Sequence, residues 1–80
     1  MSISSRQCKA ARALLDLTQA ELAGLAKVNV NTLVDFENGT RATHPRTIEA
    51  IQRALEQAGI EFIEENGGGP GLREKRRPGN

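Results

Sequence analysis

The sequence predicts an all-α domain: a compact bundle of four helices followed by a short C-terminal β-strand or hairpin. Apolar residues recur at helical spacing through residues 6–58, between residue types that start and stop helices. After Gly59, residues 60–64 mostly alternate apolar and acidic side chains, which is typical of a half-buried strand. These patterns divide the chain into a helical domain (1–59), a strand and turn extension (60–72) and a basic tail (73–80) that we expect to be disordered. The alternative for residues 72–77 is a second, weak strand.

The first two helices start at capping residues. A helix over residues 6–15 has Ser4 or Ser5 as its N-cap. Thr18 and Glu21 form a capping box, in which each side chain bonds the backbone N–H of the other residue. A second helix therefore starts at Thr18. The side chains expected to face the core from these two helices are Cys8, Ala11, Leu14, Leu15, Leu22, Ala23, Leu25 and Ala26.

The next two helices are delimited in the same way. Asn29 is the N-cap candidate of the third helix, and Gly39 ends it because glycine readily adopts left-handed backbone. Proline is favoured in the first turn of a helix, so His44-Pro45 opens the fourth, which ends at Gly59. The core residues expected from these helices are Leu33, Phe36, Ile48, Ile51, Leu55 and Ala58.

The second and third helices are short and joined by about four residues, which is typical of a helix-turn-helix. The stretch Thr18-Gln19-Ala20-Glu21-Leu22-Ala23, followed by Val28-Asn29, Leu33 and Phe36-Glu37-Asn38-Gly39, resembles the lambda repressor and Cro-like helix-turn-helix family, also called the XRE family. The resemblance covers roughly residues 4–58. It implies a lambda-repressor-like bundle whose third helix lies in the major groove of DNA.

Two features depart from the pattern of that family. Residues 60–64 read as a strand where the family has a fifth helix, so the usual dimer interface is not expected. Lys27 stands at the turn where the family normally has glycine, and a left-handed lysine costs about 1–2 kcal/mol. We therefore expect an altered or strained turn at this position.

The outward side of the third helix carries the residues predicted to read bases. Asn31 can bond N6 and N7 of adenine together, which is worth ~1–3 kcal/mol of discrimination. Val30 and Val34 can contact thymine methyl groups, although scattered surface hydrophobes need no such role. Asp35 can accept a hydrogen bond from cytosine N4 or repel phosphates, and Thr32 is a weaker candidate. No Arg or Lys lies on this side, so we expect no bidentate readout of guanine.

Phosphate contacts are expected from residues that flank this side. Gln19 opens the second helix, where free backbone N–H groups and the helix dipole attract a phosphate and the side-chain amide adds a bond. The resemblance implies the same role, and the alternative is an exposed, helix-forming glutamine. The other predicted phosphate contacts are Lys27, Asn38, Thr40, Arg41 and Arg46.

One predicted pair is structural. The resemblance implies that Arg12 of the first helix pairs with Glu37 of the third, and both residues are present. Such a pair would fix the third helix against the first. Cys8 is expected to be a small buried apolar residue. His44 is expected to serve helix entry, with a phosphate contact as the alternative.

The strand segment is the predicted dimerisation device. An isolated hairpin of this length is marginal in water. Pairing with its copy in a second subunit would extend the sheet through Ile60, Phe62 and Ile63. We therefore expect a homodimer.

Composition excludes several classes of protein. A chain of 80 residues with 38% hydrophobic and 26% charged residues forms one small domain. No apolar run approaches the ~20 residues of a membrane span, and no apolar N-terminal stretch suggests a signal peptide. The single cysteine fits a reducing cytoplasm. Because the one histidine and one cysteine lie far apart, we expect no metal site and no cofactor. Since no glycine-rich phosphate loop and no paired titratable groups are seen, we also expect no enzymatic activity.

The sequence thus predicts a bacterial or phage-type transcriptional regulator, cytoplasmic and nucleoid-associated. We expect a repressor that binds an inverted-repeat operator in double-stranded DNA as a homodimer. One alternative keeps DNA binding but makes the chain an antitoxin whose tail from Ile60 onward neutralises a protein partner. Another is a protein-interaction module that does not bind DNA.

Overall fold

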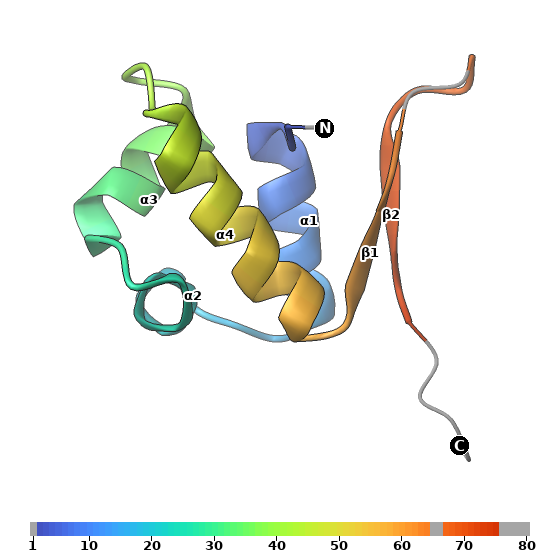
Figure 1. Ribbon diagram of the computed structural model, residues 1–80, viewed down its shortest axis with the longest axis horizontal. Helices are drawn as coiled ribbons and strands as arrows, with labels where there is room; N and C mark the ends of the chain where they lie inside the picture. Colours follow the sequence, from blue (N-terminus) through green and yellow to red (C-terminus); the bar gives the residue numbers. More distant parts are fainter. Residues whose placement is uncertain (1, 65–66, 76–80) are drawn as a thin grey trace.

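The structure is a computed structural model that describes residues 2–64 and 67–75. Its elements are the helices α1 (Ser5–Leu14), α2 (Gln19–Ala26), α3 (Val30–Asn38) and α4 (Pro45–Gln57), followed by the strands β1 (Ile60–Ile63) and β2 (Gly71–Glu74). The helices pack together, and the strands stand beside them as an antiparallel hairpin (Figure 1). The predicted fold class, an all-α bundle with a C-terminal hairpin, is confirmed.

Each helix starts at a capping residue that the sequence indicates. The side-chain oxygens of Ser4, Thr18 and Asn29 accept backbone N–H groups two or three residues ahead, at 3.1, 3.0 and 2.8 Å. In α4 the acceptor is Nδ1 of His44, 3.1 Å from the backbone nitrogen of Arg46. These bonds satisfy N–H groups that have no partner inside the helix, so each start is fixed locally.

One buried core joins the helices to the hairpin. Its largest fully buried side chains are Cys8, Leu22, Leu33, Ile51, Leu55 and Ile60. Phe62 and Leu72 pack against this core from the hairpin. The core therefore spans the helical domain and the predicted extension, which together form one folded unit.

Two leucines predicted to face the core are exposed instead. Leu14 and Leu25 have 49% and 56% of their surface accessible. Each precedes by one residue a side chain that packs inward, Leu15 in one case and Ala26 in the other. One residue is about 100° of helical rotation, which places both leucines beside the buried stripe.

Lys27 adopts the left-handed conformation at the end of α2, with φ 58° and ψ 43°. This conformation is strained for a residue with a Cβ atom. It allows the N–H of Val28 to reach the carbonyl of Ala23 at 3.0 Å, which turns the chain toward α3. The strained turn expected from the sequence is confirmed.

The hairpin pairs Phe62 with Leu72, and both side chains face the helices. On its other face, Arg73 donates from Nε to Oε1 of Glu61 at 2.8 Å. This pairing carries β2 to Glu74, two residues past the predicted end of the extension. Of the two alternatives for residues 72–77, the strand is therefore present through Glu74, and residues 76–80 of the predicted tail lie outside the described residues.

Ile60 is fully buried in the core of its own chain. The prediction that its side chain serves dimerisation needs correction, because it has no surface to offer a second subunit. Phe62 and Ile63 are half-buried, and Ile63 lies over Gly71 on the outer face of the hairpin. The sequence pattern missed this difference because alternation gives the face of a strand but not what covers each end.

Among the described residues, no helix has the length and apolar character needed to cross a membrane. The longest dimension of the molecule is 38 Å. Figure 1 shows α3 and the hairpin at opposite ends of that dimension. Whatever contacts the outward side of α3 therefore meets the molecule at the end away from the hairpin.

Candidate nucleic-acid interface

The outward side of α3 is open where the helix begins. Val30 is 39% exposed and Asn31 is exposed, whereas Thr32, Val34 and Asp35 are half-buried. Leu33, Phe36 and Glu37 form the buried side. The five predicted base-reading residues therefore lie on one helix, with the most accessible two in its first turn.

The amide of Asn31 is available for an external partner. The backbone N–H of this residue is taken by Oδ1 of Asn29 at 2.8 Å. Within residues 2–64 and 67–75, its side chain makes no hydrogen bond. An amide that offers both a donor and an acceptor side by side can bond one base edge in two places.

The end of α3 is less open than the sequence suggests. Thr40 donates its hydroxyl hydrogen to Oδ1 of Asp35 at 3.2 Å, and its backbone N–H to the carbonyl of Asp35 at 3.2 Å. Both donors of Thr40 are thus used inside the chain. A phosphate contact by this residue requires that the bond to Asp35 break.

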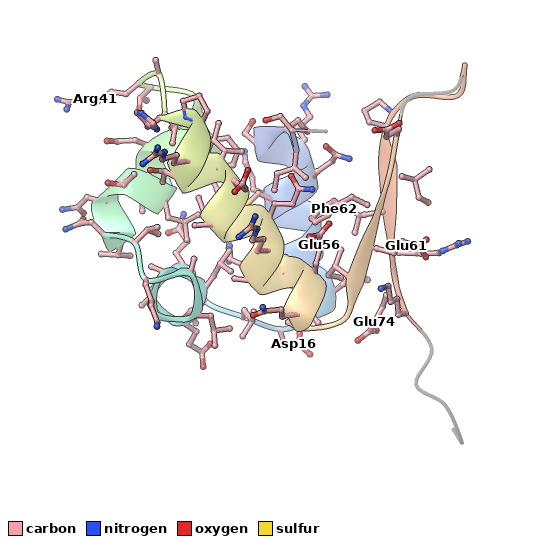
Figure 2. All side chains as sticks on the ribbon, viewed as in Figure 1. Asp16, Arg41, Glu56, Glu61, Phe62 and Glu74 are labelled. Carbon is pink, nitrogen blue, oxygen red and sulfur yellow. The ribbon has the colours of Figure 1, made fainter. Side chains whose placement is uncertain are left out.

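Asn38 and Arg41 flank the same end with exposed side chains. Figure 2 shows Arg41 projecting from the loop after α3, away from the helices. Lys27, exposed at the turn before α3, lies at the other end of this helix. Cationic and amide groups therefore bracket α3, as contacts to a polyanion require.

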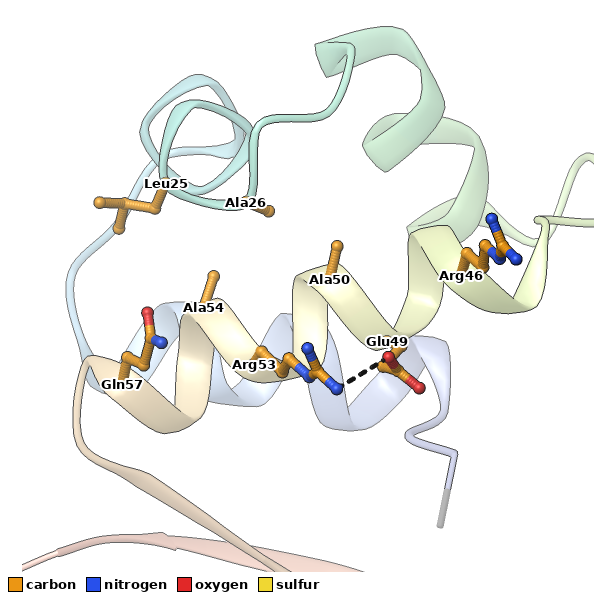
Figure 3. A pocket seen from close by; sticks show the side chains of 8 residues that line it. All are labelled: Leu25, Ala26, Arg46, Glu49, Ala50, Arg53, Ala54 and Gln57. Carbon is orange, nitrogen blue, oxygen red and sulfur yellow. Dashed lines mark ion pairs between the residues drawn. The ribbon is translucent and has the colours of Figure 1, made fainter.

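Arg46 lies on α4 at one end of a groove between α2 and α4 (Figure 3). The groove is lined by Leu25, Ala26, Arg46, Glu49, Ala50, Arg53, Ala54 and Gln57. Arg53 pairs with Glu49 at 3.1 Å, and both side chains are exposed, so this pair adds little stability. Arg46 has no such partner among the described residues, which leaves its guanidinium able to contact a phosphate.

A buried polar cluster supports α3 from behind. Arg12 donates from Nε to Oε2 of Glu37 and from Nη2 to Oε1, both at 2.9 Å. Its Nη1 donates to the carbonyl of Leu17 at 3.0 Å. The Glu37 side chain is 2% exposed, and that of Arg12 is 22% exposed. This geometry is the two-point contact that an arginine makes with a carboxylate, and it joins α3 to α1 as predicted.

Two further donors complete the bonding of the Glu37 carboxylate. Cys8 donates from Sγ to Oε2 at 3.3 Å, and Gln19 donates from Nε2 to Oε1 at 3.0 Å. Burial alone would raise the pKa of Glu37, but the hydrogen bonds from Arg12, Gln19 and Cys8 outweigh it and lower the pKa. The carboxylate is therefore held in its charged form.

Cys8 is fully buried, as expected. Its burial, its bond to Glu37 and the nearby negative charge all raise the pKa of the thiol, against the opposing effect of Arg12. A thiol with a raised pKa and no exposed surface is a poor nucleophile. The described residues also contain no group of three metal-binding side chains.

Gln19 was expected at a phosphate or, as the alternative, as an exposed helix-forming residue, whereas the structure bonds its amide to Glu37. One amide hydrogen and the carbonyl oxygen remain for another contact. Sequence reasoning also missed Gln7, which is buried and donates from Nε2 to the carbonyl of Gly71 at 3.0 Å. Its spacing from Ser4 matches a capping box, which is the signal that could have found it.

A family model described as Helix-turn-helix matches residues 9–62, well over half of the chain. The match runs from within α1 to within β1 and includes the whole of α2, the turn and α3. A comparison with curated protein sequences gave no significant match. The exposed first turn of α3, its buried anchor and the matched model agree: the chain belongs to the lambda repressor/Cro-like helix-turn-helix family of DNA-binding regulators.

Proposed function

We propose that the chain is a sequence-specific transcriptional repressor that binds an inverted-repeat operator as a homodimer, with α3 in the major groove. The observation that carries this proposal is the open first turn of α3. There the unbonded amide of Asn31 stands beside the exposed Val30, while Arg12 and Glu37 fix the opposite side of the helix. A firmly anchored helix that presents an unsatisfied amide is suited to base recognition.

Base discrimination comes from few side chains in this proposal. Asn31 bonds N6 and N7 of an adenine, and Val30 and Val34 contact thymine methyl groups. Asp35 accepts from cytosine N4 or repels an ill-placed phosphate, and Thr32 adds a minor contact. Because residues 30–38 contain no Arg or Lys, the operator half-site is read without bidentate guanine contacts from α3.

Affinity comes from the groups that bracket α3. Arg41 and Asn38 contact phosphates beyond the end of the helix, and Lys27 and Arg46 contact them from the turn and from α4. At the start of α2, the capping box bonds the N–H of Glu21 and leaves those of Gln19 and Ala20 for a phosphate. These contacts are independent of base sequence. Because the positive charges of Lys27, Arg41 and Arg46 release counterions from the phosphates, we expect binding to weaken as salt rises.

The hairpin supports the homodimer. Within the part of the chain that the structure describes, β1 has a strand neighbour on one side only. The N–H of Lys75 bonds the carbonyl of Gly59 at 2.7 Å. Because hydrogen-bonded pairs alternate along an antiparallel ladder, the N–H and C=O groups of residues 59, 61 and 63 point at β2. Residues 62 and 64 then point theirs at the open edge. Pairing of this edge with its copy, centred on Ile63, would join two hairpins into one four-stranded sheet.

Such pairing also suits the geometry of an operator. Antiparallel strands in one sheet are related by a two-fold axis perpendicular to that sheet, so both helical domains lie on the same face of it. Each α3 lies at the end of the 38 Å dimension away from its hairpin. The two recognition helices then face the same way, as two half-sites on one side of a duplex require. A dimer bound there represses by covering promoter DNA.

Selection of duplexes from a random pool by the purified chain tests this function. The selected duplex and an unrelated one are then titrated at two salt concentrations. We expect an inverted repeat to be enriched and to bind more tightly than the unrelated duplex, with both affinities falling as salt rises. Failure to bind any duplex even at low salt would contradict the proposal and favour a module that binds only proteins.

The variant Arg41→Ala separates phosphate binding from base reading. We expect it to weaken both duplexes to a similar degree and to reduce the slope of log affinity against log salt by about one unit. Arg53→Ala is the matched control, because the guanidinium of Arg53 is exposed on α4 and pairs with Glu49. A loss confined to the selected duplex would contradict the role given to Arg41.

A further inference from the structure

Gln19 makes the one direct side-chain bond between the two helices of the helix-turn-helix. Within the described part of the chain, no other hydrogen bond joins a side chain of α2 to one of α3. The remaining donors to Glu37 come from α1, through Cys8 and Arg12. Gln19 is therefore the group through which α2 holds the carboxylate that anchors α3.

The geometry gives Gln19 a share in fixing that carboxylate. Oε1 of Glu37 accepts from Nη2 of Arg12 at 2.9 Å and from Nε2 of Gln19 at 3.0 Å. Oε2 accepts from Nε of Arg12 and from Sγ of Cys8. Each oxygen thus has two donors, and removal of Gln19 leaves Oε1 with one. A carboxylate with fewer bonds has more freedom to shift, and the helix that carries it shifts too.

The amide suits this place because it is neutral. Arg12 already balances the charge of Glu37, and the Glu37 side chain is 2% exposed. A lysine at position 19 would bring a second positive charge against one buried negative charge, and a glutamate would bring a second negative charge. A glutamine donates a hydrogen bond while the local charge stays balanced.

We propose that Gln19 is a positioning residue for base recognition, which holds α3 at its angle to α2 by bonding Glu37. The proposal rests on the proposed function, because it concerns how accurately α3 presents Asn31 to a base. It differs from a phosphate contact, which would add affinity on every sequence equally. Loss of positioning instead lowers the preference for the correct base, since the amide of Asn31 must meet two atoms of one base edge.

The variant Gln19→Met tests this role, because methionine keeps the length of the side chain and removes the donor. Gln52→Met is the matched control: Gln52 donates to Glu56 at 3.2 Å on the exposed surface of α4, so the same exchange breaks the same kind of bond elsewhere. The readout is the ratio of affinities for the selected duplex and for one changed at the base pair that Asn31 reads. We expect Gln19→Met to lower this ratio roughly five-fold and Gln52→Met to leave it unchanged.

Two results of these binding measurements would overturn the proposal. If Gln19→Met weakened both duplexes equally and made the salt slope shallower, Gln19 would serve only as a phosphate contact. If both the ratio and the affinities were unchanged, Gln19 would have no role in DNA recognition. A ratio that fell because the fold had loosened everywhere would be revealed by urea unfolding of the same variant.

Amide hydrogen exchange without DNA separates this proposal from the proposed function. We expect Gln19→Met to speed exchange in α3 relative to α4, because α3 loses the side-chain hydrogen bond that joins it to α2. If the natural chain bound no duplex, the proposed function would fail. Hydrogen exchange would still test whether Gln19 holds α3 in place. Unchanged exchange in α3 would overturn the positioning role.

Discussion

Lys27 stores strain at the turn between α2 and α3. Its φ of 58° lies in the left-handed region, where glycine has no steric cost. We expect Lys27→Gly to raise the free energy of unfolding by about 0.5–1 kcal/mol. The relief of backbone strain stabilises the fold by more than the greater flexibility of the unfolded chain destabilises it. Urea unfolding without DNA measures the change.

Lys9→Gly is the matched control for that prediction. Lys9 is exposed in the interior of α1, where glycine costs about 1 kcal/mol relative to good helix formers. The two variants should therefore change stability in opposite directions. A loss of stability in Lys27→Gly would contradict this prediction. It would show that the lysine side chain stabilises the fold by more than the left-handed backbone of Lys27 destabilises it.

Single-residue predictions from sequence succeeded where the cause is local. Thr18, Asn29 and Gly39 were placed correctly because a cap depends on residues a few positions away. The bonds of Thr40 to Asp35 and of Gln19 to Glu37 were not foreseen. Periodicity tells which side of a helix a polar residue occupies, but its partner is set by how the helices pack.

The anchoring of α3 by Glu37 makes stability depend on pH. The pKa of Glu37 in the folded chain lies below its ordinary value of 4.5. A carboxyl group with a lowered pKa stabilises the fold above its unfolded pKa, and that contribution is lost as the pH falls through the folded pKa. We expect the free energy of unfolding to fall as the pH drops below about 4.5.

Glu37→Gln tests whether this anchor is responsible. We expect the variant to lose about 3 kcal/mol of stability at pH 7, because Arg12 keeps its charge without a partner. Its unfolding should also depend less on pH than that of the natural chain. Glu49→Gln is the control, since Glu49 is exposed on α4. This variant should leave both the stability at pH 7 and its dependence on pH unchanged. Equal pH dependence in Glu37→Gln and the natural chain would contradict the assignment.

Helices were more predictable than strands in this chain. All four helix starts follow from capping residues, and the N-terminal end of β1 follows from alternation after Gly59. The sequence left the segment of β2 open between a weak second strand and a disordered tail, because Arg73 and Glu74 join the sheet only through pairing with residues 61 and 60. Strand pairing depends on contacts distant in sequence, and the basic residues of this segment are equally typical of a tail.

We expect the open edge of β1 to determine the oligomeric state. Ile63 lies on the outer face of the hairpin, over Gly71, and the proposed pairing places it beside its own copy. We expect the natural chain to be a dimer by light scattering at micromolar concentration. Ile63→Lys should be monomeric, because two charges would then meet at the two-fold axis. Its operator affinity should fall, since a monomer engages only one half-site at a time.

Leu14→Lys is the control for the dimer prediction, because Leu14 is 49% exposed and lies on α1 rather than on the hairpin. It should remain dimeric. Two results would contradict dimerisation through the hairpin. One is a natural chain that is monomeric under these conditions, and the other is an Ile63→Lys variant that stays dimeric. Phe62 is less suitable for this test because it packs against the core of its own chain.

The whole molecule was predictable in outline because its helix-turn-helix carries several local signals in register. The capping box at Thr18, the Asn29 cap and the Glu37-Asn38-Gly39 segment fix the spacing of α2 and α3. The packing of the hairpin on α1 was not predictable from such signals. It depends on the buried side chain of Gln7, which reaches the carbonyl of Gly71 across 64 positions of the chain.

The proposed repressor depends above all on the reading of a base by Asn31, and the variant Asn31→Ala tests that contact. Affinities of the natural chain and this variant are compared on the selected duplex and on duplexes changed at one base pair at a time. We expect the variant to lose its preference at one position of each half-site, by roughly ten-fold, and to keep it elsewhere. Equal weakening on every duplex, with all preferences retained, would contradict this expectation.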